Sequence, residues 1–311
     1  MSGASGQELT PGTLVDGRYR VTATIARGGM GAVYDALDMR LERAVALKLL
    51  RPELAAEQEA RKRFEREALM AARLGHPNIA QVLDFGRLGD GTSFMVMERV
   101  PGETLARLLE RERRVVPLRA ADIVRQGLEG LEAAHAAGIV HRDIKPGNVM
   151  TLREAGGRDV VKVLDFGVAR LMETQAYTRL TSTGVIVGTP AYMAPEQARG
   201  DAVDARTDVH AMGVLLYCLV AGRKPFDGDV VSILEGVLHR APPPLGDLAP
   251  ASPPGLVAIV ERALRKDPLQ RFASAADMAR ALAGLSVERP ASVQRTSLMP
   301  AWESPAVTVN A

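Results

Sequence analysis

The chain has 311 residues, 47% of them hydrophobic, and a formal net charge of +2 at pH 7. This length admits one large domain or two lobes, and so small a charge gives no sign of a nucleic-acid-binding or strongly membrane-binding surface. The single cysteine, Cys218, cannot form an intramolecular disulfide, which suits a reducing cytoplasm. Residues 1–12 lack the regions of a signal peptide, and the longest apolar run, Val209 to Ala221, is too short to span a bilayer.

The predicted elements begin with a small lobe. Residues 1–13 are small and polar and are expected to form a flexible leader. Residues 14–97 alternate strand-like runs with one helix, Glu57 to Leu74, which predicts a mainly antiparallel sheet with a single helix. Residues 98–102 contain Pro and Gly and form a short connector.

Residues 103–285 are predicted to form a larger, helix-rich lobe. Gly138 fits the end of one of its helices, because glycine readily adopts the conformation of a helix C-cap. Residues 286–311 are rich in Ser, Pro and Val and are expected to be disordered. The predicted helices are Ala120 to Ala137, Asp208 to Ala221, Val230 to Leu238, Leu256 to Leu264 and Ala275 to Leu285.

A glycine-rich turn follows the first predicted strand, Tyr19 to Ile25. Small residues in the run Ala26 to Val33 would let backbone N–H groups approach phosphates, although hairpins also use glycine and the turn alone is a weak signal. The run Ala44 to Lys48 follows. An unpaired ammonium in an apolar strand is costly, so Lys48 is expected to meet phosphate oxygens and a carboxylate.

Two glutamates of the predicted helix 57–74 could supply that carboxylate. Glu67 lies beside the apolar stripe of the helix, whereas Glu65 is more easily explained as a solvated charge. We therefore favour Glu67 as the partner of Lys48, with Glu65 as the alternative.

The most informative stretch is His141 to Asn148, which is followed by Asp165-Phe166-Gly167. Asp143, Lys145 and Asn148 supply a candidate base, a cation and a metal ligand on one loop, and Asp165 adds a second metal ligand. Phosphoryl transfer from ATP needs this set, because its transition state is mostly charge that has to be positioned and neutralised.

With these motifs the chain resembles the bacterial Hanks-type, eukaryotic-like serine/threonine protein kinases from Arg18-Tyr19 to Arg271-Phe272. So many motifs in the right order are highly specific. They are Gly28-Gly29-Met30-Gly31, Val45-Ala46-Leu47-Lys48, His76-Pro77-Asn78-Ile79, Val96-Met97-Glu98, His141 to Asn148, Asp165-Phe166-Gly167, Gly188-Thr189-Pro190, Ala194-Pro195-Glu196, Asp208 and Lys266 to Arg271.

The resemblance implies an α+β, bilobal protein kinase fold, in which a small β lobe with one key helix faces a larger helical lobe across an ATP cleft. Met97 would be the gatekeeper, and the backbone of Glu98 and Val100 would bond the adenine. The implied nucleotide-binding residues are Ile25, Ala26, Arg27, Gly28, Gly29, Met30, Gly31, Ala32, Val33, Lys48, Glu67, Glu98 and Val100.

The resemblance also implies roles for the charged residues. Asp143 would orient the substrate hydroxyl and accept its proton, and Lys145 would neutralise charge on the transferred group. Asn148 and Asp165 would ligate Mg²⁺, with Mn²⁺ as an alternative ion. Two further roles are structural: Asp208 would bond the catalytic-loop backbone, and Glu196 with Arg271 would form a buried ion pair.

The position of Lys145, two residues after Asp143, is typical of kinases that phosphorylate serine and threonine in proteins. Thr181 and Thr183 resemble the doublet that is phosphorylated in bacterial relatives, and Arg142 before Asp143 is seen in kinases switched in this way. The expected partners are protein substrates and a kinase homodimer for trans-autophosphorylation, without nucleic acid or membrane contact.

Two departures from the family pattern stand out. Ala26 replaces the first glycine of the glycine-rich motif, and Arg99 stands where an aromatic residue is frequent, which would alter the mouth of the pocket. Two alternative functions remain: a pseudokinase scaffold, and a small-molecule phosphotransferase. The retained Lys48, Asp143 and Asp165 disfavour the first, and the long segment from Gly167 to Glu196 disfavours the second.

Overall fold

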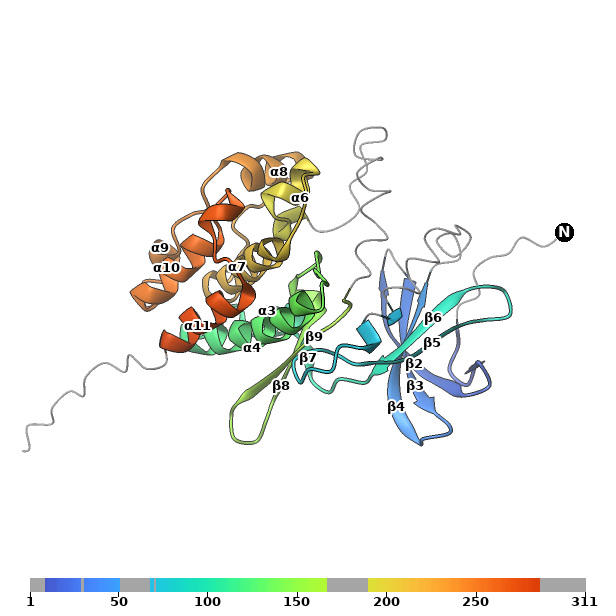
Figure 1. Ribbon diagram of the computed structural model, residues 1–311. Coiled ribbons are helices and arrows are strands. Elements are labelled where there is room, and N and C mark those ends of the chain that lie inside the picture. The colour runs from blue at the N-terminus through green and yellow to red at the C-terminus, as the bar shows by residue number, and fades with distance from the viewer. Residues whose placement is uncertain (1–8, 29–30, 51–67, 70, 167–189, 286–311) are drawn as a thin grey trace, which may run out of the picture.

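The computed structural model describes residues 9–28, 31–50, 68–69, 71–166 and 190–285 (Figure 1). Most of the predicted leader, most of the predicted helix 57–74 and the predicted disordered tail 286–311 lie outside these residues. Within the leader, the amide of Gly12 donates to Val21, and Thr13 accepts from the Val21 amide. These two bonds join residues 12 and 13 to the small lobe, ahead of the boundary expected at residue 14.

The small lobe is a six-stranded antiparallel sheet in the order β1-β2-β3-β4-β6-β5. Its second strand continues to Gly28, so Ala26 to Gly28 are strand residues and not part of the turn that the sequence suggested. The strands are β1 (Leu14–Val15), β2 (Tyr19–Gly28), β3 (Gly31–Asp38), β4 (Arg43–Leu50), β5 (Val82–Arg87) and β6 (Ser93–Glu98).

The alternation of side chains along β3, β4 and β6 gives this sheet two different faces. Tyr34, Leu47 and Val96 lie opposite one another on β3, β4 and β6 and belong to a cluster that covers one face. The next row, Val33, Lys48 and Met95, points to the other face because successive side chains of a strand alternate. The sheet therefore directs Lys48 toward the large lobe.

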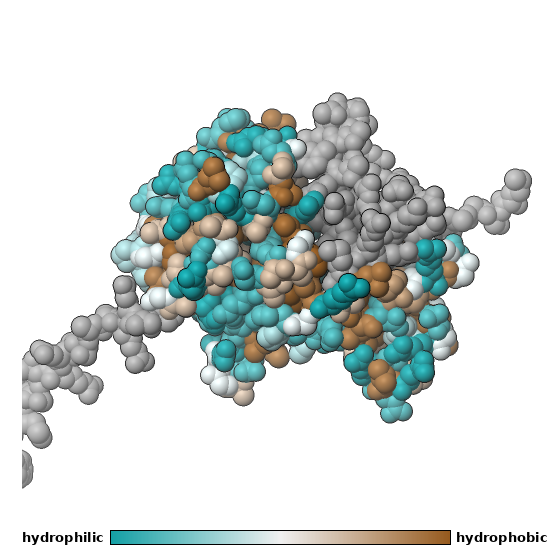
Figure 2. Space-filling model, in the orientation of Figure 1, coloured by the Kyte–Doolittle hydropathy of each residue, from teal (hydrophilic) through white to brown (hydrophobic). Residues whose placement is uncertain are grey.

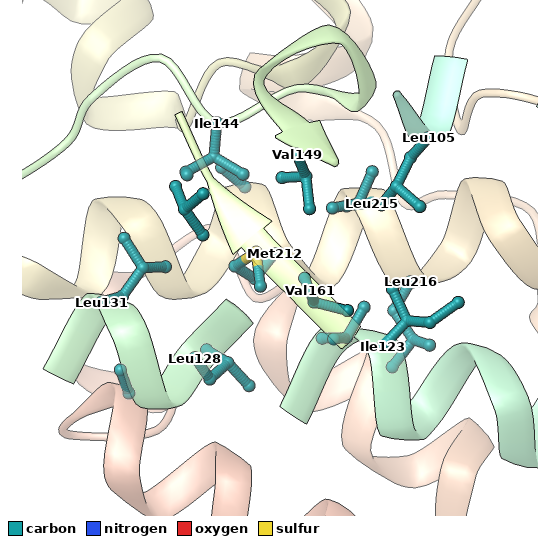
Figure 3. Close-up of a cluster of buried hydrophobic side chains, with 14 of the residues drawn as sticks. Leu105, Ile123, Leu128, Leu131, Ile144, Val149, Val161, Met212, Leu215 and Leu216 are labelled. Atoms are coloured by element: carbon teal, nitrogen blue, oxygen red, sulfur yellow. The ribbon is translucent and has the colours of Figure 1, made fainter. Parts of the chain in front are cut away.

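The large lobe is built around α7, which is buried on every side from Thr207 to Ala221. A helix that is buried on all sides is stable only inside a core. α4 packs along α7, and α11 and β9 pack against α4 (Figure 1). Figure 3 shows Leu128 of α4 close to Met212 of α7, and Ile123 of α4 close to Val161 of β9. The helices are α3 (Leu105–Glu112), α4 (Pro117–Ala136), α6 (Pro195–Arg199), α7 (Ala205–Ala221), α8 (Val230–His239), α9 (Leu245–Leu248), α10 (Pro254–Ala263) and α11 (Ala275–Leu285).

The five predicted helices of this lobe are present, and α4, α7 and α10 start two or three residues earlier than predicted. Asp204 caps α7 through the amide of Arg206, and Pro117 and Pro254 occupy first-turn positions, where proline loses no helical hydrogen bond. Gly138 has a φ of +74°, as expected at the end of α4. The sequence did not predict α3 or the three-stranded sheet of β7 (Glu103–Thr104), β8 (Val149–Arg153) and β9 (Asp159–Val163).

The visible surface mixes hydrophilic and hydrophobic side chains (Figure 2). The most exposed large hydrophobic residues, Val116, Val231 and Leu269, lie on separate elements, and single exposed apolar residues are normal for a folded domain. In the part of the chain that the structure describes, no helix is long and apolar enough to cross a membrane.

Candidate active site

The buried carboxylate of Asp208 holds the loop that leads to Asp143, the candidate base. Asp208, at the start of α7, is fully buried and accepts hydrogen bonds from the amides of His141 and Arg142, each at 2.8 Å. His135 Nε2 lies 2.8 Å from the oxygen that also binds the His141 amide. Because α7 is buried on every side from Thr207 to Ala221, these bonds anchor the loop to the core of the lobe.

Arg142 adopts a backbone conformation that side chains disfavour, with a φ of +68°. Such a residue costs about 1–3 kcal/mol and persists only where its surroundings hold it. Here both backbone groups are held, because its amide binds Asp208 and its carbonyl accepts from Gln197 Nε2 at 2.8 Å. The strained turn fixes the direction in which the next residue, Asp143, leaves the chain.

Three side chains meet immediately after this turn. Lys145 Nζ lies 2.6 Å from Asp143 Oδ2, and Asn148 Nδ2 donates to the same oxygen at 3.0 Å and to the Asp143 carbonyl at 2.8 Å. Neither side-chain contact uses Oδ1 of Asp143. About 30% of the Asp143 side chain is exposed, so the carboxylate remains accessible to a reactant.

Asp165 comes two residues after β9 and is also strained, with a φ of +57°. The neighbouring Phe166 is buried and packs edge-on against His141, with ring centroids 4.8 Å apart, and His141 Nε2 lies 2.7 Å from the Leu164 carbonyl. These contacts turn the Asp165 carboxylate toward the small lobe. There it forms an ion pair with Lys48, Nζ to Oδ1, at 2.8 Å.

The charge state of Asp165 follows from two opposed effects. Burial by itself would raise the pKa of this carboxyl group, but the charge and hydrogen bond of Lys48 outweigh burial and lower the pKa below its ordinary value. The side chain is therefore a carboxylate at neutral pH. It remains available to a second cation besides Lys48, because a quarter of its surface is exposed.

These residues fit a hard divalent cation. The amide nitrogen of Asn148 is engaged by Asp143, which leaves the amide oxygen as the atom that can bind a metal ion. Together with the Asp165 carboxylate this gives two oxygen ligands, and Mg²⁺ is commonly held by one or two protein oxygens together with substrate phosphates. Among the described residues there is no group of three or more His, Cys, Asp and Glu side chains that would bind a metal without such help.

The predicted phosphate-covering residues lie at the turn end of the β2–β3 hairpin. Ala26 lies opposite Val33, Arg27 opposite Ala32, and Gly28 opposite Gly31. Gly31 has a φ of +151°, and a Cβ atom there would lie 1.8 Å from the carbonyl oxygen of Leu49, so only glycine fits. Ile25 is on β2, while Gly29 and Met30 lie outside the described residues.

The connector starts at the end of β6. Glu98 Oε1 accepts from the Gln81 amide at 2.9 Å and from Lys162 Nζ at 2.7 Å, which ties the connector to β9 of the large lobe. Arg99 pairs with Asp35 of β3, and its Nη1 donates to the carbonyl of Val100 at 2.8 Å. Sequence reasoning had singled out Arg99 but not Asp35.

The predicted structural pair is present and almost completely buried. Arg271 Nη1 and Nη2 donate to the two oxygens of Glu196 at 2.7 and 2.8 Å, and Thr207 Oγ1 adds a third bond at 2.9 Å. Burial alone would raise the pKa of Glu196, but the bonds and charge of Arg271 reverse the shift and lower it. The pair joins α6 to the end of the helical lobe.

The structure thus brings Lys48 of the small lobe and Asp165 together with the loop that carries Asp143, Lys145 and Asn148. It does not test Glu67, Thr181 or Thr183, which lie outside the described residues. Sequence reasoning missed the supporting residues Gln197, Thr207 and Asp35. Their amide, hydroxyl and carboxylate groups are common on surfaces, and no local pattern indicates that they bind distant parts of the chain.

Comparisons with known proteins agree with this geometry. The family model described as protein kinase domain matches residues 19–281. The chain is 43% identical over 276 residues to the serine/threonine-protein kinase pkn3 of Myxococcus xanthus, covering 88% of this chain and 50% of that protein. It is 40% identical over 283 residues to the serine/threonine-protein kinase PknA of Mycobacterium tuberculosis, covering 89% and 63%.

Among solved structures, the kinase domain of PknI from Mycobacterium tuberculosis superimposes with a TM-score of 0.70 at 29% identity, covering 89% of this chain and 99% of that domain. The chain therefore belongs to the protein kinase family, and its similarity to these relatives places it among the bacterial serine/threonine kinases of the Hanks type. The bilobal α+β fold expected from the sequence is confirmed. The chain spans about half the length of several of these relatives, for example 50% of pkn3.

Proposed function

We propose that this chain transfers the γ-phosphoryl group of ATP to serine or threonine hydroxyl groups of proteins. The observation that carries the proposal is the Lys48–Asp165 ion pair beside the Asp143, Lys145 and Asn148 cluster, since the charge of Lys145 helps to lower the pKa of Asp165. Phosphoryl transfer depends on positioning and charge neutralisation, and this arrangement offers a cation from each lobe with carboxylates between them.

In this proposal Asp143 receives the substrate hydroxyl and accepts its proton, because its Oδ1 is not used by Lys145 or Asn148. Lys145 holds Asp143 in place and adds positive charge beside the transferred group. Lys48 binds phosphate oxygens from the small lobe, where its ion pair with Asp165 already marks an anion-binding position. Each of these groups is fixed by its neighbours before substrate arrives.

The nucleotide would lie against the face of the sheet that carries Lys48. Ile25 and Val33 would cover the base, the backbone of Glu98 and Val100 would bond its edge, and the residues from Ala26 to Ala32 would lie over the phosphates. Protein kinases use a divalent cation in general, and we propose Mg²⁺, or Mn²⁺ in its place, held by Asn148 and Asp165. When bound, the ion would neutralise negative charge on the phosphates.

Substitution of Asp143 by asparagine tests this assignment against the pseudokinase alternative. We expect Asp143→Asn to lower turnover on a generic basic protein substrate by about 10²–10⁴-fold, because the proton acceptor is lost. Affinity for a non-hydrolysable ATP analogue should change little, since Asp143 faces the hydroxyl and not the nucleotide. Wild-type protein that binds nucleotide without turnover would favour a pseudokinase, and turnover restricted to small-molecule acceptors would favour the other alternative.

We also propose autophosphorylation at Thr181, Thr183 or both, within a homodimer. Arg142, beside the base, carries the guanidinium that a phosphothreonine would meet with paired hydrogen bonds. The support comes from the sequence, since both threonines lie outside the described residues. Phosphosite mapping on wild type and on Asp143→Asn should find phosphate at these positions only in the former. A double alanine variant with full activity would contradict the proposal.

The remaining proposals concern organisation and location. We assign residues 14–97 to the small lobe, to which residues 12 and 13 are also hydrogen-bonded, 98–102 to the connector and 103–285 to the large lobe. We further propose that these residues act in the cytoplasm, where ATP is supplied. Limited proteolysis with mass mapping would test the boundaries, because cleavage should concentrate outside residues 14–285.

A further inference from the structure

The connector carries an ion pair that the proposed phosphoryl transfer does not use. Arg99 Nε donates to Oδ1 of Asp35, and Arg99 Nη2 lies 3.2 Å from Oδ2 of the same carboxylate. The third donor, Nη1, binds the carbonyl of Val100 at 2.8 Å. One guanidinium therefore links β3 of the small lobe to the backbone of the connector.

The sheet register explains why these two residues meet. Asp35 of β3, Ala46 of β4 and Met97 of β6 lie opposite one another, on the same face as Lys48. Arg99 follows Met97 by two residues. The strand between the two partners contributes only the methyl group of Ala46, and two strand spacings are about 10 Å, a distance that a long arginine side chain bridges.

Glu98, the residue before Arg99, has different partners from Arg99. Glu98 binds Lys162 of β9 at 2.7 Å and the amide of Gln81 at 2.9 Å. The Glu98 side chain is thus tied to both lobes, through Gln81 and Lys162, whereas the Arg99 guanidinium is tied to the small lobe. The Arg99 link is the one that reaches the sheet face where the nucleotide is proposed to lie.

We infer that Arg99 and Asp35 form a clamp that positions the connector against β3 and so preorganises the nucleotide site. The inference rests on the proposed function and deepens it. Asp35 lies two residues from Val33, about 7 Å along the strand, and Val100 is the connector residue whose backbone is proposed to bond adenine. A connector that is already in place loses less conformational freedom when nucleotide binds, which tightens binding. The clamp does not contact the reacting groups, so both partners are positioning residues.

A double-mutant cycle tests the clamp. Affinity for Mg²⁺ with a non-hydrolysable ATP analogue is measured for wild type, Arg99→Ala, Asp35→Ala and the double variant. We expect each single variant to bind about three- to tenfold more weakly, and the double variant to be no weaker than either single. Turnover at saturating ATP should change by less than about twofold, because the transition-state contacts are intact.

The matched control is Arg125→Ala. Arg125 also pairs with two carboxylates, Asp122 and Glu129, but all three lie within α4. The Arg125→Ala variant should therefore bind nucleotide with the same affinity as wild type. The two clamp side chains are 36% and 28% exposed, so the loss in the single variants should shrink in about 1 M salt, where the Debye length is about 3 Å.

Hydrogen exchange of the backbone amides in residues 98–102, without nucleotide, provides a second readout. Exchange should be faster in both single variants than in wild type and in Arg125→Ala. Additive losses in the cycle, a loss in Arg99→Ala alone, or unchanged affinity in both singles would overturn the clamp. These results differ from failure of the proposed function, in which wild-type protein would not bind the analogue at all.

Discussion

Two ion pairs of the described residues, Arg271–Glu196 and Lys48–Asp165, differ in how completely the surrounding protein fills their hydrogen-bonding capacity. Arg271 and Glu196 have side chains that are 0% and 5% exposed, and the Arg271 guanidinium also donates to the carbonyls of Arg206, Arg265 and Lys266. Lys48 and Asp165 form their pair at the lobe junction, and a quarter of Asp165 is exposed. A saturated pair can only hold structure, whereas the open pair can still take up a ligand.

The same contrast separates two aspartates of the catalytic region. Asp208 uses both oxygens to hold the loop backbone and is fully buried. Asp143 uses one oxygen for Lys145 and Asn148 and is 30% exposed. Both residues are aspartates, but only Asp143 keeps an oxygen that Lys145 and Asn148 do not use. This difference separates the aspartate proposed to act on substrate from the aspartate that supports the loop.

The largest effect is expected at the open pair. Lys48→Met and Asp165→Asn should each lower phosphoryl transfer by about 10³-fold or more, because each removes a charge from the proposed phosphate and metal site. The thermal midpoint should fall by only a few degrees, since neither side chain fills the core. ATP-dependent phosphorylation and thermal unfolding of the same preparations measure both quantities. If either variant kept activity within tenfold of wild type, the Lys48–Asp165 pair would not be the functional pair that we contrast with Arg271–Glu196.

Breaking the Arg271–Glu196 pair should lower the free energy of unfolding rather than act directly on phosphoryl transfer. Arg271→Ala leaves the Glu196 carboxylate buried without its cation, and such half-broken pairs cost about 3–5 kcal/mol. For a domain of this size that corresponds to a fall in the thermal midpoint of about 5–10 °C. Arg280→Ala, whose pair with Asp277 lies within α11 and is largely exposed, is the matched control and should unfold like wild type.

The pH dependence of stability sharpens the comparison further. Burial alone would raise the pKa of Glu196, but Arg271 lowers it below the ordinary glutamate value of about 4.3. The ionised Glu196 therefore adds its full contribution to the free energy of unfolding when the pH is above that ordinary value. This stabilising contribution is lost as the pH falls through the lowered pKa that Glu196 has in the folded protein. The difference in thermal midpoint between wild type and Glu196→Gln should therefore narrow below about pH 4. A difference that stays constant down to pH 3 would show that charge is not the basis of the pair.

The smallest effect is expected at Ala26, a site residue without charge. Ala26→Gly should tighten nucleotide binding by less than about fivefold or leave it unchanged, because removal of the Cβ lets the backbone approach the phosphates while adding flexibility. Titration with a fluorescent ATP analogue measures the change. A large loss of affinity would mean that the alanine is required for the shape of the β2–β3 hairpin.

The sequence alone determined the chemistry of the site. Asp143, Lys145 and Asn148 fall within one short loop, so local chain geometry is enough to bring them together, and the order of the motifs identified the family and its two-lobed fold. The long helices were also predictable, because α11 keeps apolar residues at helical spacing over its 11 residues and α7 is a long, nearly continuous apolar run. The strands of the β7–β8–β9 sheet have only two or five residues, too few to show a period.

Only the tertiary structure decided which charges meet. Lys48 could be expected to need a carboxylate, but its contact with Asp165 depends on how the two lobes are joined. The pairing of Arg99 with Asp35 depends on the register of three strands and on the small side chain of Ala46 between them. Likewise, Gln197 holds the strained Arg142 only because α6 lies against the catalytic loop. Partners of this kind are far apart in the chain, and local sequence does not encode distances that arise from packing.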